Sequence, residues 1–399
     1  MTASVLLYVQ YLLGIGHLQR TLRIAEALAH DGIAVTLVGG GMPAALPRDP
    51  AIRFVQLPPV RALDARFELV DSAGRPINDA LREERRAALL AAFAAARPGA
   101  VVIEGFPFAR RAFRFELEPL IAAVRGTAPR PRLICSVRDI IVARDDPLRR
   151  REIVDRVRAD FDAVLVHSDP AFIPFDASFP AAPEIADRLI YTGYVSPRAE
   201  SRNGAATIGA DEIVVSAGGG AAGHSLLRAA LDARLSGCLA GLPWRFITGT
   251  NLPEADFAAL CAQVPAGVIV ERFRQNFNNL LRGCRVSVSQ AGYNTVLDIL
   301  AARARAVLVP FAAARETEQL LRAERLAALG AVELVRESEL SPDRLARAIE
   351  RAASHEPAAV LLDTGGAARS ARLIAAMLGC RDRPAGDFAT VASQGMIAR

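Results

Sequence analysis

The stretch "SVLLYVQYLLGIGHLQRTLRIAEALAHDGIAVTLVG", residues 4–39, decides the fold. Residues 4–10 form a continuous apolar run that predicts a buried strand, and residues 33–39 form a second one. Between them lies a glycine-containing turn followed by a helical pattern over residues 17–31. Uninterrupted apolar strands joined by a helix are typical of a parallel sheet with helices on its faces. The stretch therefore predicts the first βαβ unit of an α/β protein.

The same alternation of strand and helix runs through both halves of the chain. Further strands are predicted at residues 52–57, 100–105, 132–137 and 163–168, and then at residues 213–220, 244–249, 268–273, 285–290, 306–311 and 331–335. The polar segment "VSPRAESRNGAATIGADE", residues 195–212, interrupts the rhythm and reads as a linker. We therefore expect two doubly wound Rossmann-like domains that face each other across a cleft. The N-terminal domain comprises residues 1–205 and the C-terminal domain residues 206–380, and residues 381–399 form a tail.

Composition excludes several classes of protein. The chain has 399 residues, 52% hydrophobic, with a formal net charge of +5 and only 6% aromatic residues, which argues against a nucleic-acid interface. Its five cysteines are scattered without a C-x-x-C pair, so we expect no zinc site and a cytoplasmic location. No apolar stretch approaches the roughly 20 residues of a membrane helix, and the N-terminus does not resemble a signal peptide.

The first glycine loop, "GIGHLQ" at residues 14–19, does not fit a dinucleotide fingerprint. Gln19 occupies the third glycine position, and the second strand ends without an acidic residue. Gly14 and Gly16 still allow a tight turn close to a ligand. His17 falls in the first turn of the predicted helix, where the helix dipole favours a neutral imidazole able to accept a proton. The alternative is that His17 only caps or packs.

Three further loops follow predicted strands of the second half. The segment "SAGGGAAGHS", residues 216–225, exposes backbone N–H groups at a helix start and suits a diphosphate. The segment "SQAGYNTVLD", residues 289–298, carries Asn294 and places Thr295 and Asp298 on one helix face. The loop that follows the predicted strand at residues 306–311 leads to Glu318 and Gln319, whose polar groups suit a sugar. The alternative explanation of the glycine-rich segment is that its glycines are needed only for packing. The alternative for the Glu318–Gln319 segment is an ordinary solvated helix start.

The order "VERF", "VSVSQAGYNTVLDIL", "AVLVPF" and "EQLLRAERLAALGA" resembles the donor-binding half of GT-B glycosyltransferases. The resemblance is strongest from Val270 to Ala331, and it is closest to family 28, the family of the undecaprenyl-lipid N-acetylglucosaminyltransferases. Two positions depart from the family pattern: Ala291–Gly292 replaces a Gly-Gly pair, and Asp298 replaces a glutamate.

The resemblance implies roles for individual residues. Those on the donor side are Gly16, Gly219 and Gly220 near the diphosphate, Phe273 at the nucleobase, Gly292, Asn294 and Thr295 near the alpha phosphate, Asp298 on the ribose, and Glu318 and Gln319 on the sugar. His17 would take a proton from the acceptor hydroxyl or position that hydroxyl, and Glu104, at the end of a predicted strand, is the alternative base.

The predicted function is a metal-independent, inverting transfer of a sugar from a UDP-linked donor, with no cofactor. The acceptor stays open among small molecules, lipid-linked molecules and polysaccharides. A hydrolase, an epimerase and a non-catalytic nucleotide-sugar binder on the same fold are the alternatives. The segment "FPFARRAFRF", residues 106–115, mixes Phe and Arg and is the candidate for a peripheral contact with the inner face of the membrane. An ordinary amphipathic helix would give the same pattern.

Overall fold

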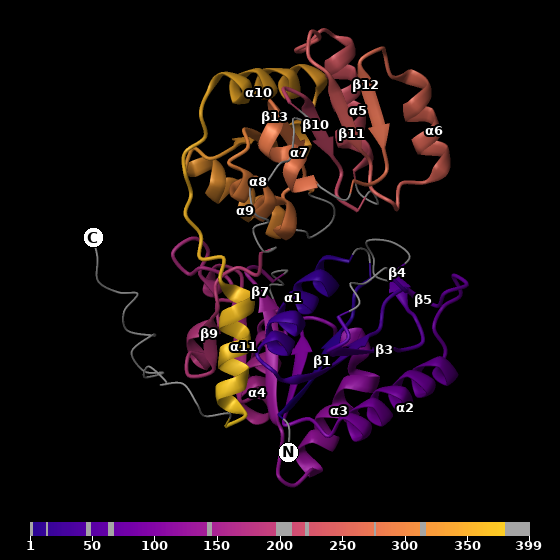
Figure 1. Cartoon of the computed structure of the whole chain (residues 1–399), viewed down its shortest axis with the longest axis vertical. Coiled ribbons are helices and arrows are strands. Elements are labelled where there is room, and N and C mark those ends of the chain that lie inside the picture. Colours follow the sequence, from indigo (N-terminus) through magenta and orange to yellow (C-terminus); the bar gives the residue numbers. More distant parts are fainter. Residues whose placement is uncertain are drawn as a thin grey trace.

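The computed structural model describes residues 3–12, 15–44, 49–62, 68–141, 146–196, 210–219, 223–274, 277–311 and 317–379. These residues form two α/β domains, one above the other in Figure 1. The predicted tail, Gly14 and Gly220 lie outside the described residues.

The N-terminal domain is built on a seven-stranded parallel sheet in the order β3-β2-β1-β6-β7-β8-β9. Its strands are β1 (Ser4–Val9), β2 (Ala34–Gly39), β3 (Ile52–Gln56), β6 (Ala100–Glu104), β7 (Arg132–Arg138), β8 (Ala163–His167) and β9 (Leu189–Tyr191). The helices are α1 (Gly16–His30), α2 (Asp79–Ala96), α3 (Arg114–Gly126) and α4 (Pro147–Asp160). Strands β1, β6, β7 and β8 are buried along almost their whole length, as continuous apolar runs require.

The C-terminal domain repeats this plan on a six-stranded parallel sheet in the order β12-β11-β10-β13-β14-β15. Its strands are β10 (Ile213–Ser216), β11 (Trp244–Ile247), β12 (Val268–Glu271), β13 (Val286–Ser289), β14 (Ala306–Leu308) and β15 (Glu333–Leu334). Its helices are α5 (His224–Leu235), α6 (Glu254–Gln263), α7 (Phe277–Gly283), α8 (Tyr293–Ala302), α9 (Glu318–Ala328) and α10 (Pro342–Ser354). The predicted fold class, two doubly wound domains, is confirmed.

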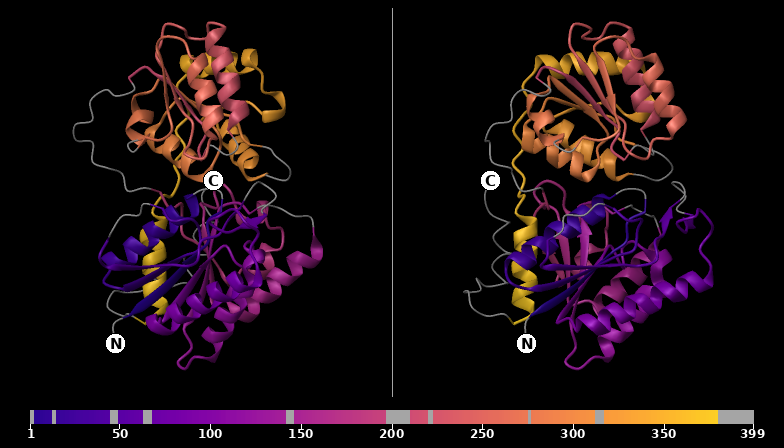
Figure 2. Two further views of the ribbon diagram at one scale, coloured as in Figure 1. Left: turned by 90° about the vertical axis from the view of Figure 1, so that its right-hand side faces the viewer. Right: turned by 45° about the vertical axis from the view of Figure 1, so that its right-hand side comes forward.

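The last helix, α11 (Gly366–Met377), belongs to the N-terminal domain in space. It leaves the upper domain and runs down beside α1 in both figures of the whole chain (Figures 1 and 2). Ala371 and Ile374 join the core cluster formed by α1 and the first strands. Gly366 allows this return, because a Cβ atom there would lie 2.3 Å from the carbonyl oxygen of Gly193. The expected boundary of the C-terminal domain, residues 206–380, therefore includes a helix that packs on the N-terminal domain. The apolar face of α11 contacts α1, which lies far away in the sequence.

The two domains share a hydrophobic cluster. Ile140, Phe172 and Tyr194 of the N-terminal domain pack with Tyr293 and Leu297 of α8 in a single group of buried side chains. This cluster brings the loops at the carboxyl ends of both sheets together, because α8 and α9 follow β13 and β14 while α1 follows β1. Ligands bind at these ends in doubly wound sheets.

The Phe-rich segment at residues 106–115 turns inward. Phe106, Phe108 and Phe113 are buried in the core of the N-terminal domain, so their rings form no exposed apolar patch. Within the part of the chain that the structure describes, no helix has the length and apolarity to cross a bilayer.

A buried histidine at the end of β8 makes the stability depend on pH. His167 lies between the hydroxyls of Ser136 (2.7 Å) and Thr192 (2.8 Å), and burial lowers its pKa from 6.5 to about 3. The unfolded chain therefore binds one more proton than the native protein between these values. Each such group lowers the free energy of unfolding as the pH falls, with a slope that approaches about 1.4 kcal/mol per pH unit well below pH 6.5. Urea unfolding at pH 7, 6 and 5 should show a slope that is shallower by this amount in His167→Gln; an unchanged slope would contradict the neutral buried state.

Candidate active site

His17 and Glu104 form a hydrogen-bonded pair at the carboxyl edge of the N-terminal sheet. His17 is the second residue of α1, and Glu104 ends the neighbouring strand β6. The Nδ1 atom of His17 lies 2.7 Å from Oε1 of Glu104. The side chain of His17 keeps 25% exposure while that of Glu104 keeps only 3%, so the ring can be reached from outside and the carboxylate cannot.

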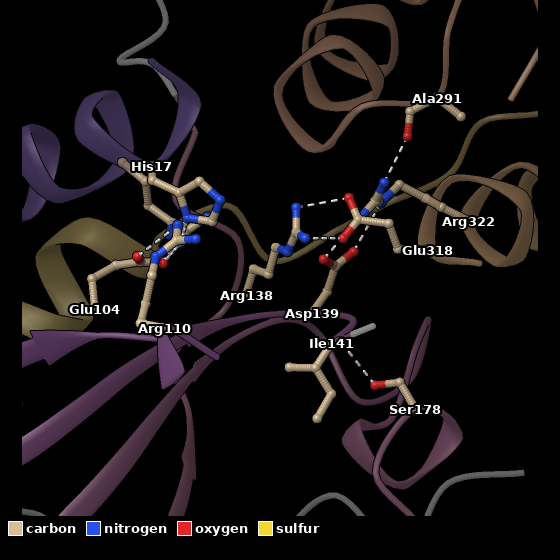
Figure 3. Close-up of polar contacts among 11 residues, drawn as sticks. His17, Glu104, Arg110, Arg138, Asp139, Ile141, Ser178, Ala291, Glu318 and Arg322 are labelled. Atoms are coloured by element: carbon tan, nitrogen blue, oxygen red, sulfur yellow. Dashed lines mark hydrogen bonds and ion pairs between the residues drawn. The ribbon is translucent and has the colours of Figure 1, made fainter. Parts of the chain in front are cut away.

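Two arginines share the carboxylate of Glu104. Arg20, one helical turn after His17, donates from Nη2 to Oε1 at 2.6 Å. Arg110 approaches Oε2 at 3.5 Å (Figure 3). Burial alone would raise the pKa of Glu104, but His17, Arg110 and Arg20 outweigh it and hold that pKa well below its usual range. Glu104 is therefore a buried anion whose oxygens are already engaged, and its geometry suits orienting His17 better than accepting a proton.

The imidazole of His17 is neutral. Burial is the main cause and lowers its pKa to about 3; Glu104 opposes this effect, while Arg110 and Arg20 reinforce it. Because Glu104 is an acceptor, the Nδ1 atom carries the hydrogen, which leaves Nε2 as the proton-accepting atom. The helix start predicted a neutral ring, and the structure adds burial and two arginines as causes.

The N-terminus of α8 faces this pair from the C-terminal domain. Gly292 caps the helix in an extended conformation. The side chain of Asn294 reaches the N-terminal domain, since a Cβ atom on Gly16 would lie 3.1 Å from its Nδ2. Gly16 and Asn294 are thus brought together across the domain interface. Thr295 lies on the same first turn of α8.

Asp298 lies one turn further along α8. Burial raises its pKa from 3.8 to about 6, and Arg23 of α1 and a hydrogen bond from Asn278 only partly oppose this effect. Its Oδ1 atom is buried and has no hydrogen-bond partner among the described residues. A buried acceptor without a partner costs free energy, so this oxygen suits the hydroxyl of a ligand.

Two ion pairs join the start of α9 to the end of β7. Arg138 donates to Oε1 of Glu318 at 2.7 Å, and Arg322 binds both carboxylate oxygens of Asp139 at 2.9 Å (Figure 3). Arg138 and Asp139 therefore pair across the domain interface rather than with each other. Gln319 uses its carbonyl oxygen to accept the backbone N–H groups of Ala291 and Phe311, both at 3.1 Å.

The remaining predicted donor residues lie at the ends of other strands. Gly219 is exposed in the turn after β10, and its carbonyl oxygen accepts from the N–H of Asn251. Phe273, just after β12, exposes 66% of its surface, which is unusual for an aromatic residue and suits stacking on a base. Gly220 falls outside the described residues.

Sequence reasoning missed several residues of this site: Arg20, Arg110, Tyr293 and Arg322. Arg20 could have been found from its position three residues after His17 on a helix. The others come from separate elements, and only the packing of the domains shows that they belong here. No group of three or more His, Cys, Asp or Glu side chains that could hold a metal ion occurs in the described ranges.

Solved structures share this architecture over nearly the whole chain. The glycotransferase of kitacinnamycin aligns with 95% of this chain and all of its own at a TM-score of 0.62 and 16% identity. Acinetobacter baumannii MurG aligns over 93% and 95% of the two chains at a TM-score of 0.56 and 17% identity. The rhamnosyltransferase SpnG complexed with thymidine diphosphate aligns over 99% and 100%, at 0.56 and 17%. The two domains therefore have the GT-B fold of glycosyltransferases.

The sequence of the C-terminal domain also matches a family model. Residues 214–375 match the glycosyltransferase family 28 C-terminal domain. A curated relative from Brucella anthropi is 46% identical over 70 residues, and one from Nitrosococcus oceani is 47% identical over 64 residues. Each is a UDP-N-acetylglucosamine–N-acetylmuramyl-(pentapeptide) pyrophosphoryl-undecaprenol N-acetylglucosamine transferase. The matched segments span 18% of either relative, and 18% and 16% of this chain.

The ion pair between Asp139 and Arg322 should matter most for stability. Both side chains are fully buried, so Asp139→Asn leaves a buried guanidinium without its counter-ion and should cost about 3–5 kcal/mol in the free energy of unfolding. Arg336→Met is the control, because its ion pair with Glu324 is exposed on both sides and its loss should cost at most about 1 kcal/mol. Equal losses in urea unfolding would contradict the assignment of Asp139–Arg322 as the inner, desolvated pair.

Proposed function

We propose that this protein is a glycosyltransferase that moves a sugar from a nucleotide-sugar donor, UDP-linked, to the hydroxyl of an acceptor. The observation that carries the proposal is the neutral imidazole of His17. Its Nδ1 is held by a buried carboxylate, and α8 of the donor-type domain faces it across the interface. The family of residues 214–375 supports the donor class, and the names of the curated relatives support UDP.

The chemistry follows from the two nitrogens of His17. Nε2 takes the proton of the acceptor hydroxyl as its oxygen attacks the anomeric carbon, and the bond from that carbon to the diphosphate oxygen breaks as the nucleoside diphosphate leaves. The imidazolium that forms is stabilised by Glu104 at Nδ1. A single displacement of this kind inverts the anomeric configuration. Glu104 acts here as the group that orients His17.

The donor site is formed by loops of the C-terminal domain. In this proposal Gly219, Gly220, Gly292, Asn294 and Thr295 receive the diphosphate at the ends of β10 and β13, where backbone N–H groups and a helix start favour an anion. Phe273 stacks on the base, Asp298 accepts from the ribose hydroxyls, and Glu318 and Gln319 contact the sugar. No step requires a cofactor.

The acceptor is any molecule that presents a hydroxyl to Nε2 of His17. We place the reaction in the cytoplasm, on the evidence of the scattered cysteines. The inner face of the membrane is the place where a lipid-linked acceptor would be met.

Incubation with a panel of nucleotide sugars, without acceptor, separates the candidate activities. Slow release of free sugar with tight binding of UDP supports a transferase. Fast release identifies a hydrolase, and conversion of the bound sugar into its epimer identifies an epimerase. Binding without any turnover, also when acceptor candidates are added, identifies a non-catalytic binder and contradicts the proposal.

His17→Asn tests the base. Asparagine keeps a hydrogen bond to Glu104 but cannot take a proton, so kcat should fall by about 10²–10⁴ while UDP affinity stays nearly unchanged. His30→Asn is the matched control, because His30 ends the same helix and its side chain is exposed. Unchanged kcat in His17→Asn would return Glu104 to the role of base. Loss of UDP binding would move His17 to the phosphate site.

Asp298 makes donor binding depend on pH. Its carboxylate is ionised above about pH 6, so the affinity for UDP-N-acetylglucosamine should fall as the pH drops from 7.5 to 5. Loss of charged hydrogen bonds, roughly 1.5–3 kcal/mol, corresponds to about 10- to 100-fold weaker binding. Asp298→Asn should bind weakly at both values. Calorimetry with this diester avoids a titrating phosphate, and a pH dependence that persists in Asp298→Asn would exclude Asp298 as its source.

A further inference from the structure

Tyr293 inserts its hydroxyl from the C-terminal domain into the N-terminal domain. It is the first residue of α8 and keeps only 7% exposure. Its hydroxyl accepts the backbone N–H of Val195 at 3.0 Å and donates to the carbonyl oxygen of His167 at 3.2 Å. The start of α8 is therefore fixed against the ends of the N-terminal strands by a hydroxyl whose hydrogen-bonding capacity is used.

The ring of Tyr293 lies beside two guanidinium groups. The central carbon of Arg20 lies 5.4 Å from the ring centroid, and that of Arg322 lies 5.9 Å from it. Both distances fall within the range of cation–π attraction, which is stronger away from water. Tyr194 packs against the same ring at a centroid distance of 5.5 Å but makes its own hydrogen bond to Asp139.

The guanidinium of Arg20 also contacts the His17–Glu104 pair. One of its terminal nitrogens, Nη2, donates to Glu104 at 2.6 Å and lies 3.2 Å from Nδ1 of His17. Its Nε atom is buried and has no hydrogen-bond partner among the described residues. The ring of Tyr293 is thus the support of this guanidinium on the side of the C-terminal domain, and Arg20 is the group that touches both the ring and the His17–Glu104 pair.

We propose that Tyr293 is a positioning residue for the base: it holds Arg20 against Glu104 and so couples the start of α8 to the orientation of His17. This inference rests on the proposed function for its catalytic meaning. The contacts run in one sequence, from the helix that would carry the donor phosphates through Tyr293, Arg20 and Glu104 to His17. The base is therefore fully oriented only when the two domains are packed as they are here.

The test compares Arg20→Met, Tyr293→Leu, and the double variant with the wild-type protein. Tyr194→Leu is the control for ring packing at the interface: it removes the neighbouring ring of Tyr293 but keeps the two hydrogen bonds of Tyr293 and its contact with Arg20. The first readout needs no substrate: the His17 signal is followed by NMR from pH 8 to 3, assigned among the five histidines with His17→Asn. Arg20 and Arg110 lower the pKa of His17 and Glu104 raises it, so loss or displacement of Arg20 should raise it.

The wild-type protein and Tyr194→Leu should show the same His17 midpoint, at the acidic end of this range. Arg20→Met and Tyr293→Leu should both bring its midpoint upward, and the double variant should equal Arg20→Met, because the ring acts through Arg20. A Tyr293→Leu titration identical to wild type, or a double variant in which the two shifts add, would overturn the proposal.

The second readout is turnover of the best nucleotide sugar of the panel. In Tyr293→Leu kcat should fall about tenfold through misplacement of the base, with UDP affinity kept, and the double variant should lose no more than Arg20→Met. Losses that multiply, or an equal fall in Tyr194→Leu, would overturn the positioning role. Absence of turnover in the wild-type protein would refute the proposed function alone, because the NMR titration still decides the role of Tyr293.

Discussion

The arrangement of the whole molecule depends on the guanidinium of Arg322. It binds both oxygens of Asp139 from the other domain and the carbonyl oxygen of Ala291, which lies just before the cap of α8. One buried cation thus joins the end of β7, the start of α9 and the loop after β13. The neighbouring pair Arg138–Glu318 has the opposite polarity, so a shift of one domain along the other would bring like charges together. The two pairs specify a single register of the domains.

This register determines the electrostatics of the interface between the two domains. Once the domains are packed, His17 lies beside two arginines and one glutamate, and desolvation, reinforced by the two arginines, keeps its ring neutral. Desolvation has the opposite meaning for Asp298, where it favours the protonated acid. The same physical cause therefore prepares a base on one side of the interface and a pH-sensitive acceptor on the other.

Most strands of the two sheets could be predicted from the sequence, because long apolar runs such as residues 4–10 identify buried strands without tertiary information. Sequence reasoning missed β9 and the short hairpin of β4 (Arg61–Ala62) and β5 (Leu69–Val70), which are too short to show a pattern. The helix α11 could not be placed, since its partner α1 lies more than 300 residues earlier in the chain. Arg138 and Asp139 stand side by side in sequence, and only the domain packing shows that their partners are on α9.

A crystal structure with an intact UDP-sugar tests the central claim most directly. The account predicts the diphosphate at the start of α8, within hydrogen-bond distance of Asn294 or Thr295. It also predicts Nε2 of His17 facing the anomeric carbon, with space between them for one hydroxyl within about 3 Å of the nitrogen. A nucleotide bound elsewhere in the chain, or His17 in direct contact with the diphosphate, would contradict the account.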